Sequence, residues 1–378
     1  MTSNTQSYPG GELQVTELRP NVRLWQPATD VLHQPEIIAQ EPGCEQVFLG
    51  LPLGECGGVM MANTVIRQIS EDTGVVFGNH EPTHGADANA NFVALGAVFD
   101  RPVQAIEPGS PYVISAHGAA PSVTAEAQAQ GLQVFDVTCP LVHKTHAAIL
   151  SAKPREHDPE SRRARVAYIS FGKANHPELV GAAGVAAEND ISFTVVADEE
   201  QVDAMVQATP VDEKIVVVGQ TTNNSDQAEA LAAYLQGRAE ERGISIQREG
   251  KRDVCHTVRD RQRSTREIVT AHNVGSLIVV GSVNSKNTKS LAMVATEEAA
   301  RTGQTLDIYL TNSWAQLPEI GGTVGVVSGA STLEQNVRGV IDRLAPKQGV
   351  IEVGTDTDKD IIFRPVDLFT RRYNSSRP

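Results

Sequence analysis

The feature that most constrains this chain is an internal repeat marked by three cysteines. Cys56, Cys139 and Cys255 each follow a strand-like run and precede a segment with helical patterning. After each cysteine, at 28, 37 and 32 residues, an apolar run ends in a loop bearing His or Asn. A second apolar run ends in a small polar loop at 61, 82 and 76 residues. The recurrence predicts three similar α/β units. Their loops would meet at the carboxyl ends of the strands, where ligands bind in α/β sheets.

The chain is long enough for several hydrophobic cores, with 378 residues. From Glu45 onward, short apolar runs alternate with longer helical patterns, as in βαβ units. Three such units converging on a pseudo-threefold axis would form a trefoil. The predicted parts are an N-terminal extension (1–45), three α/β domains (46–138, 139–254 and 255–345) and a C-terminal tail (346–378). The polar stretch 153–165 is predicted to be a surface loop, and Phe363, Phe369 and Tyr373 are expected to dock the tail on the body.

Charge and hydropathy exclude several classes of protein. The net charge of −14 disfavours nucleic acids and anionic membranes as partners. No apolar run approaches the ~18–20 residues that a membrane span needs, so no membrane segment is expected. The first residues lack the basic and apolar regions of a secretory signal, which predicts a cytoplasmic protein. Four cysteines are too few for a disulfide framework in a chain of this length.

The three repeated cysteines indicate a metal centre. The N-terminus of a helix lowers the pKa of a thiol and favours the thiolate. Zinc would need a histidine or water as a fourth ligand, whereas a 4Fe–4S cluster held by three cysteines would leave one iron open to a substrate. The alternative is that all three are buried structural cysteines. Cys44 lies outside the repeat and has no assigned role.

The loops of the repeat carry side chains that suit a phosphate or diphosphate. They are His84, His117, His176, Thr221, Ser285, Asn287 and Ser331. A phosphate-binding GxxxxGK[ST] motif is absent, so nucleotide hydrolysis is not indicated. Glu178 follows His176 by two residues. In a desolvated pocket its carboxyl group would have a raised pKa and could donate a proton; on an open loop it would simply be solvated.

Nine motifs between Phe48 and Val337 match one family in order. They are GECGGV, HEPTH, SAHGAAP, DVTCPLVHKTH, HPELVG, QTT, DVC, GSVNSKN and GAST. In these motifs the sequence resembles the 4-hydroxy-3-methylbut-2-enyl diphosphate reductases, which catalyse the last step of the non-mevalonate isoprenoid pathway. It departs from them at Gly85, usually Asn, at Lys286, usually Ser, and in the segment after Cys255.

The resemblance implies a trefoil of three α/β domains around one 4Fe–4S cluster per chain, held by Cys56, Cys139 and Cys255. The substrate hydroxyl would bind the open iron. The implied pocket residues are His84, His117, His176, Thr221, Ser285, Lys286, Asn287 and Ser331. Glu178, helped by Thr221, would deliver a proton. The implied reaction is reductive dehydroxylation to isopentenyl and dimethylallyl diphosphate, with electrons from a ferredoxin or flavodoxin.

Two other hypotheses remain open from the sequence. A divergent paralogue could keep the cluster as a redox or oxygen sensor without catalysis. A zinc-dependent hydrolase acting on a phosphorylated substrate would use the same cysteines with a different metal.

Overall fold

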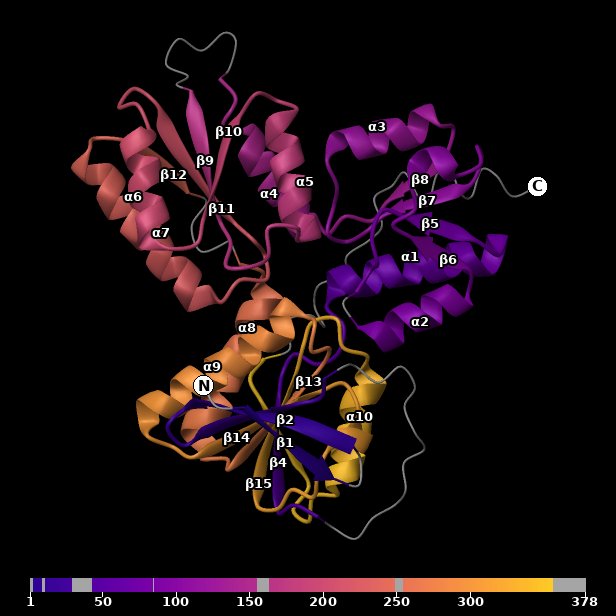
Figure 1. The fold of residues 1–378 in the computed structure, drawn as a ribbon, viewed down its shortest axis with the longest axis vertical. Helices are drawn as coiled ribbons and strands as arrows, with labels where there is room; N and C mark the ends of the chain where they lie inside the picture. The colour runs from indigo at the N-terminus through magenta and orange to yellow at the C-terminus, as the bar shows by residue number, and fades with distance from the viewer. Residues whose placement is uncertain are drawn as a thin grey trace. The chain divides into compact units, whose positions relative to one another are not determined.

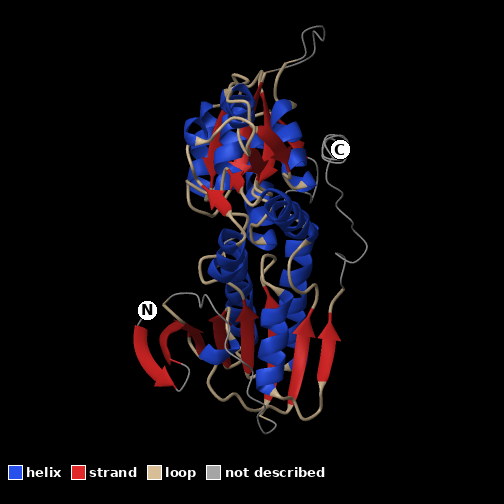
Figure 2. Cartoon of the chain, turned by 90° about the vertical axis from the view of Figure 1, so that its right-hand side faces the viewer, coloured by secondary structure: helices blue, strands red, loops and turns tan. Residues whose placement is uncertain are grey.

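The computed structural model describes residues 3–8, 11–28, 43–83, 85–154, 163–248 and 254–355. These residues form three β-sheets flanked by helices (Figure 1, Figure 2). They divide into two compact units: the first holds the described parts of Met1–Val59, Thr83–Asn91 and His256–Ile362, and the second those of Met60–Pro82 and Phe92–Cys255. His84, the three tail aromatics and most of the predicted 153–165 loop lie outside the described residues.

The second unit contains two four-stranded parallel sheets with the same strand order. One has the order β6-β5-β7-β8, from β5 (Val76–Gly78), β6 (Ala97–Phe99), β7 (Pro111–Ile114) and β8 (Gln133–Asp136). The other has the order β10-β9-β11-β12, from β9 (Ala164–Ile169), β10 (Ser192–Val196), β11 (Lys214–Gly219) and β12 (Ser245–Arg248). In each sheet the strand that precedes a cysteine pairs with the strand of the small polar loop.

The first unit repeats this order and closes it with a strand from the other end of the chain. β14 (Leu306–Thr311), β13 (Ser276–Val280) and β15 (Thr323–Ser328) are followed by β4 (Gln46–Gly50), which is parallel to β15. β16 (Val350–Val353) extends this edge. The α/β prediction and its repeat are therefore confirmed. The domain boundaries stay a prediction. In the sheet, β4 from the predicted first domain (46–138) lies beside β13–β15 from the predicted third domain (255–345).

The described helices connect these strands. They are α1 (Gly57–Thr73), α2 (Ala86–Ala94), α3 (Pro121–Ala129), α4 (Pro140–Leu150), α5 (Pro177–Ala187), α6 (Glu199–Ala208), α7 (Ser225–Glu241), α8 (His256–His272), α9 (Lys286–Thr302) and α10 (Glu334–Leu344). None in the described ranges is both long and apolar enough to cross a bilayer.

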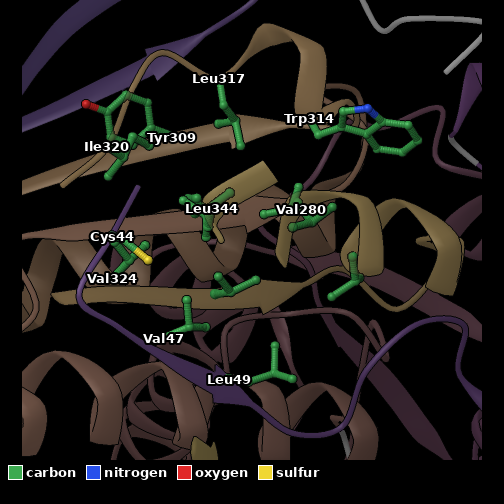
Figure 3. Close-up of a cluster of buried hydrophobic side chains, with 14 of the residues drawn as sticks. Cys44, Val47, Leu49, Val280, Tyr309, Trp314, Leu317, Ile320, Val324 and Leu344 are labelled. Carbon is green, nitrogen blue, oxygen red and sulfur yellow. The ribbon is translucent and has the colours of Figure 1, made fainter. Parts of the chain in front are cut away.

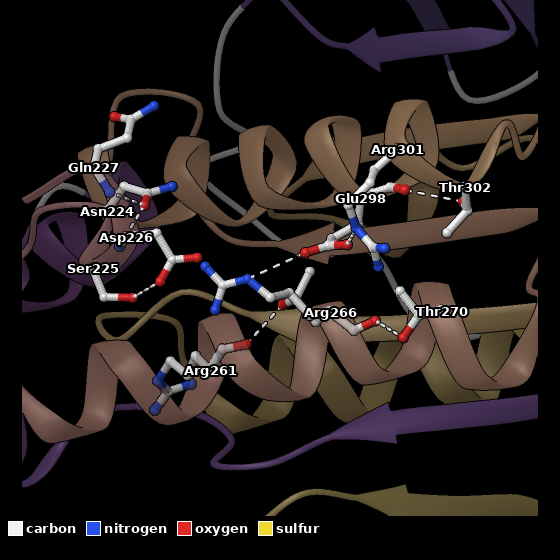
Figure 4. Close-up of polar contacts among 11 residues, drawn as sticks. Asn224, Ser225, Asp226, Gln227, Arg261, Arg266, Thr270, Glu298, Arg301 and Thr302 are labelled. Carbon is white, nitrogen blue, oxygen red and sulfur yellow. Dashed lines mark hydrogen bonds and ion pairs between the residues drawn. The ribbon is translucent and has the colours of Figure 1, made fainter. Parts of the chain in front are cut away.

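Alternation along β13 builds a core on each face of the eight-stranded sheet. Ile278 and Val280 belong to a cluster with Val337, Val340 and Leu344 of α10. Figure 3 shows Val280 and Leu344 in this cluster. The intervening residues of the strand contact α8 and α9 in a second cluster. A carboxylate on α9, Glu298, joins those two helices through Arg266 at 3.5 Å and also pairs with Arg301 at 2.8 Å (Figure 4).

The N-terminal extension adds strands to this sheet. β3 (Val22–Gln26) pairs in parallel with β14, and β2 (Gly11–Arg19) and β1 (Ser3–Tyr8) follow antiparallel. Trp25 stacks on Tyr309 with ring centroids 5.6 Å apart, and both oxygens of Asp307 accept from Arg23 at 2.6 Å. These contacts join segments distant in sequence, so local patterning could not predict them.

Gly339 of α10 provides a test of core packing. A Cβ at this position would collide with the buried ring of Trp314. Gly339→Ala should lower the free energy of unfolding by ~1–3 kcal/mol in urea titrations, because overpacking forces side chains out of position. Gly237→Ala in α7 is the control, since its Cβ would meet no heavy atom within 4 Å. The control should be neutral or stabilising, as expected for alanine in a helix. Equal stability of the two variants would contradict the packing at Trp314.

Candidate functional site

The three repeated cysteines share one backbone arrangement. Each lies directly before a helix: α1, α4 or α8. The N–H of Cys56 donates to Ala330 O at 2.8 Å, that of Cys139 to Ala116 O at 3.0 Å and that of Cys255 to Thr221 O at 2.9 Å. All three acceptors belong to the small polar loops identified in the sequence. Each loop therefore holds the cysteine of the following repeat, and the last loop holds the first cysteine.

The cysteines also differ in exposure from a structural thiol. All three are partly exposed and reduced, whereas Cys44 is fully buried, and burial raises the pKa of its thiol. The alternative that all three are buried structural cysteines therefore does not fit their exposure. Within the described residues, no group of three His, Cys, Asp or Glu side chains is arranged to hold a single metal ion.

In the second unit, a continuous series of contacts connects Cys139 with Cys255. The backbone N–H of Cys139 donates to the carbonyl oxygen of Ala116, the residue before His117. The ring of His117 meets that of His176 edge to face, with centroids 5.7 Å apart. His176 caps α5, and its Nδ1 accepts from the N–H of Glu178 at 3.2 Å. In the neutral ring this leaves the proton on Nε2, which can donate to an anion.

Glu178 continues the series to Thr221. Its Oε1 accepts from the N–H of Thr221 at 2.8 Å, and its Oε2 accepts from Thr221 Oγ1 at 3.0 Å. The Thr221 carbonyl then accepts from Cys255. Glu178 is only 2% exposed, which rules out the solvated alternative. Pro177 at the first helical position fixes the start of α5. The first turn of this helix therefore positions Glu178 from one side, and the loop that contains Thr221 holds its carboxyl group from the other.

In the first unit, the described residues of the predicted site lie at the ends of three adjacent strands. Glu55 forms an isolated bridge with Ser331, next to the bond between Cys56 and Ala330. Ser285 caps α9 through a bond from Thr288 N to its Oγ at 3.4 Å. Lys286 begins that helix and is partly exposed. Their strands β4, β15 and β13 are neighbours in the sheet.

Asn287 has the strongest structural sign of a ligand site. Its side chain is 4% exposed, and in the described part of the structure neither its Oδ1 nor its Nδ2 has a hydrogen-bond partner. The Oγ1 of the neighbouring Thr288 is also buried without a hydrogen-bond partner among the described residues. Leaving a buried polar group unpaired costs about 1–3 kcal/mol, so this amide is expected to bond to a bound molecule.

Arg261 is a buried residue whose role the sequence did not show. Its guanidinium is in α8, six residues after Cys255, and the residue is 1% exposed. Nη1 donates to Pro52 O at 2.8 Å and Ser328 O at 3.0 Å, and Nη2 donates to Gly54 O at 2.9 Å. It thus fixes the loop that leads to Cys56. The only signal for it in the sequence is its position six residues after Cys255.

His146 lies beneath the turn after His117 and should make the protein sensitive to acid. A Cβ on Gly118 would lie 3.2 Å from its Cε1. Burial, with a smaller contribution from His143, lowers its pKa from 6.5 to about 4, against the opposing effect of Asp136. The unfolded chain therefore binds this proton below pH 6.5, but the folded chain does so only below about 4.

The free energy of unfolding should consequently fall as the pH drops through this range. Protonation of His146 in the unfolded chain should lower the free energy of unfolding at pH 5 by up to about 2 kcal/mol relative to pH 7. Urea unfolding at the two pH values should show a smaller loss for His146→Gln than for the wild type. His80→Gln, at an exposed histidine, is the control and should not reduce the loss. An unchanged loss in His146→Gln would refute this assignment.

Comparison with known proteins establishes the family. A family model described as "LytB protein" matches residues 47–345. The chain belongs to the LytB family. Among curated members, the 4-hydroxy-3-methylbut-2-enyl diphosphate reductase of Tolumonas auensis is 33% identical over 330 residues, covering 85% of this chain and 99% of that protein. Reductase 1 of Mycobacterium bovis is 34% identical over 332 residues, with coverages of 86% and 92%.

Solved structures show the same fold as this LytB chain. The E-1-hydroxy-2-methyl-but-2-enyl-4-diphosphate reductase of Plasmodium falciparum aligns with a TM-score of 0.74 at 22% identity, covering 88% of this chain and 99% of that one. A second structure, described as the terminal enzyme of the non-mevalonate pathway, aligns with a TM-score of 0.56 over 79% of this chain. At this identity the likeness shows the fold alone.

Proposed function

We propose that this LytB chain is a 4-hydroxy-3-methylbut-2-enyl diphosphate reductase that removes the allylic hydroxyl group to give isopentenyl and dimethylallyl diphosphate. The observation that carries the proposal is the contact series from Cys139 through His117, His176, Glu178 and Thr221 to Cys255. The series supports the proposal because histidine and glutamate, side-chain types that can bind anions and carry protons, lie in it between two cysteines of matching backbone geometry.

The donor set fits a 4Fe–4S cluster held by Cys56, Cys139 and Cys255. Each residue is a partly exposed thiol at a helix N-terminus, where the thiolate is favoured. When bound, such a cluster supplies electrons and an open iron that polarises the C–O bond of the substrate.

The side chains of the protein bind the diphosphate and handle the proton. His176 can donate through Nε2, and Asn287 offers an amide whose buried polar atoms have no protein partner in the described residues. His84, His117, Ser285, Lys286 and Ser331 complete the proposed set. Glu178, held by Thr221, delivers a proton to the departing oxygen, which leaves as water when the C–O bond breaks. The reaction takes up two electrons from the donor and two protons in all, and the second proton is added to a carbon of the allylic group to give the two products. A small donor such as ferredoxin or flavodoxin supplies the electrons, and a cytoplasmic location accords with this biosynthetic role.

Anaerobic purification followed by iron and sulfide analysis tests the cluster. About four of each per chain are expected for a 4Fe–4S group. Reduced methyl viologen should then be oxidised when the diphosphate substrate is added, with formation of both products. An intact cluster without turnover would contradict the reductase proposal and would be the result expected of a redox sensor. Stoichiometric zinc without iron would contradict both and favour a hydrolase.

A further inference from the structure

Arg261 is a buried cation of the first unit that has no part in the proposed chemistry so far. It lies in α8 and is 1% exposed. An apolar side chain of similar length would fill this space without the cost of burying a charge. The guanidinium therefore needs an explanation in the groups that it contacts.

Those groups belong to two loops that are far apart in the sequence. In the loop before Cys56, Pro52 O accepts from Nη1 at 2.8 Å and Gly54 O accepts from Nη2 at 2.9 Å. In the loop after β15, the carbonyl oxygen of Ser328 accepts from Nη1 at 3.0 Å and its Oγ does so at 3.1 Å. A guanidinium carries its donors in a rigid planar fork, so one arginine can bond to several oxygens that lie in different directions.

The same two loops are also bonded directly to each other. The N–H of Gly54 donates to Ser328 Oγ at 3.2 Å, so this hydroxyl oxygen accepts from both Gly54 and Arg261. Two residues further along, the N–H of Cys56 donates to Ala330 O at 2.8 Å. The backbone of Cys56 is therefore fixed by a pair of loops that Arg261 holds together.

Without Arg261, these loops would bury carbonyl groups that have lost a charged donor. Pro52 and Gly54 are buried, and Ser328 is 1% exposed. Buried polar groups that lose their partners destabilise the conformation that buries them. We expect the loop before Cys56 to open in order to hydrate its carbonyl groups, while the strands of the sheet keep their own hydrogen bonds.

We propose that Arg261 is a positioning residue for Cys56: its guanidinium holds the loop before Cys56 against the loop after β15, so that the thiol stays where it can bind the cofactor. This inference rests on the proposed function, because it takes Cys56 as a ligand of the cluster. Arg261 itself is not a ligand.

Hydrogen exchange of the anaerobically purified protein tests the loop. Lysine keeps the charge but lacks the fork, so the amides of Gly54 and Cys56 should exchange about tenfold faster or more in Arg261→Lys. Amides of β13, in the core of the same sheet, should change less than about twofold. Unchanged exchange in the loop would overturn the proposal. Equal acceleration in β13 would also overturn it, because that result indicates a general loss of stability.

Arg263→Lys is the matched control for this experiment. Arg263 lies on the same helix, but its side chain is 57% exposed and pairs with Asp260 at 3.1 Å. Its exchange should be that of the wild type, because a surface ion pair contributes little to stability. Acceleration of the loop amides to the same extent in this control would count against a specific role of Arg261.

Release of iron to a chelator, measured anaerobically, follows the cofactor instead of turnover. Arg261→Lys should release its iron about tenfold faster than the wild type, because one of the three thiols is less firmly held. Arg263→Lys should release it at the wild-type rate. Equal rates in the wild type and Arg261→Lys would contradict the proposal.

Ser328→Ala provides a second variant in case Arg261→Lys does not fold. It removes the hydroxyl group that accepts from Gly54 and Arg261 but keeps the carbonyl oxygen of residue 328. Exchange of the Gly54 amide should rise about threefold or more, as expected for the loss of a neutral hydrogen bond. An unchanged rate would refute the role of this contact. If the wild type holds iron but lacks reductase activity, the proposed function fails, while exchange and iron release still decide the role of Arg261.

Discussion

Cys139→Ser should lose most of its bound iron while keeping the wild-type fold. Cys139 caps α4 and is followed by Pro140, so the helix start does not depend on the sulfur atom. Serine preserves the backbone bond to Ala116 but is a much poorer ligand for iron. Iron should fall from about four per chain to less than one, or to about three if the cluster converts, and reductase turnover should disappear.

Iron and sulfide analysis with an anaerobic absorption spectrum measures this effect, and far-ultraviolet circular dichroism checks the fold. Cys44→Ala is the matched control, because Cys44 is fully buried in the core of the eight-stranded sheet. The control should retain all its iron. Iron lost from Cys44→Ala but kept in Cys139→Ser would show that the wrong thiols have been assigned.

Glu178→Gln should reduce turnover by ~10²-fold or more without affecting cluster content. Glutamine keeps the size of the side chain, and its oxygen can still accept from the N–H of Thr221. It cannot release a proton to the departing hydroxyl group. We therefore expect kcat to fall much more than KM changes, measured anaerobically with reduced methyl viologen.

Glu188→Gln is the control for this variant, because Glu188 ends the same helix and accepts from the N–H of Ser122 on the surface. Its turnover should stay within about twofold of the wild type. If Glu178→Gln turned over at nearly the normal rate, proton delivery would have to be assigned elsewhere.

The repeat of cysteines and apolar runs was sufficient to predict the fold class. The runs before Cys56 and Cys139 form β4 and β8, β12 ends seven residues before Cys255, and the polar loops follow the expected strands. The cyclic pairing of loops and cysteines could not be predicted in the same way. Strand order decides it, and the partners Cys56 and Ala330 lie at opposite ends of the chain, beyond the reach of any local pattern.

Burial decided what the sequence left open at the site. A glutamate two residues after a histidine reads equally well as solvated or functional, and only the bonds to Thr221 distinguish these cases. The role of His84 stays a prediction.

The closure of the eight-stranded sheet by β4 has a consequence for biosynthesis. β4 ends at Gly50, whereas its partner β15 begins at Thr323. During translation the segment before Cys56 therefore stays without its β15 partner until Thr323–Ser328 has been synthesised. The loop that fixes Cys56 is complete only after Ala330 has followed, so Cys56, although it is the first of the three repeated cysteines to be made, is the last to gain its backbone bond.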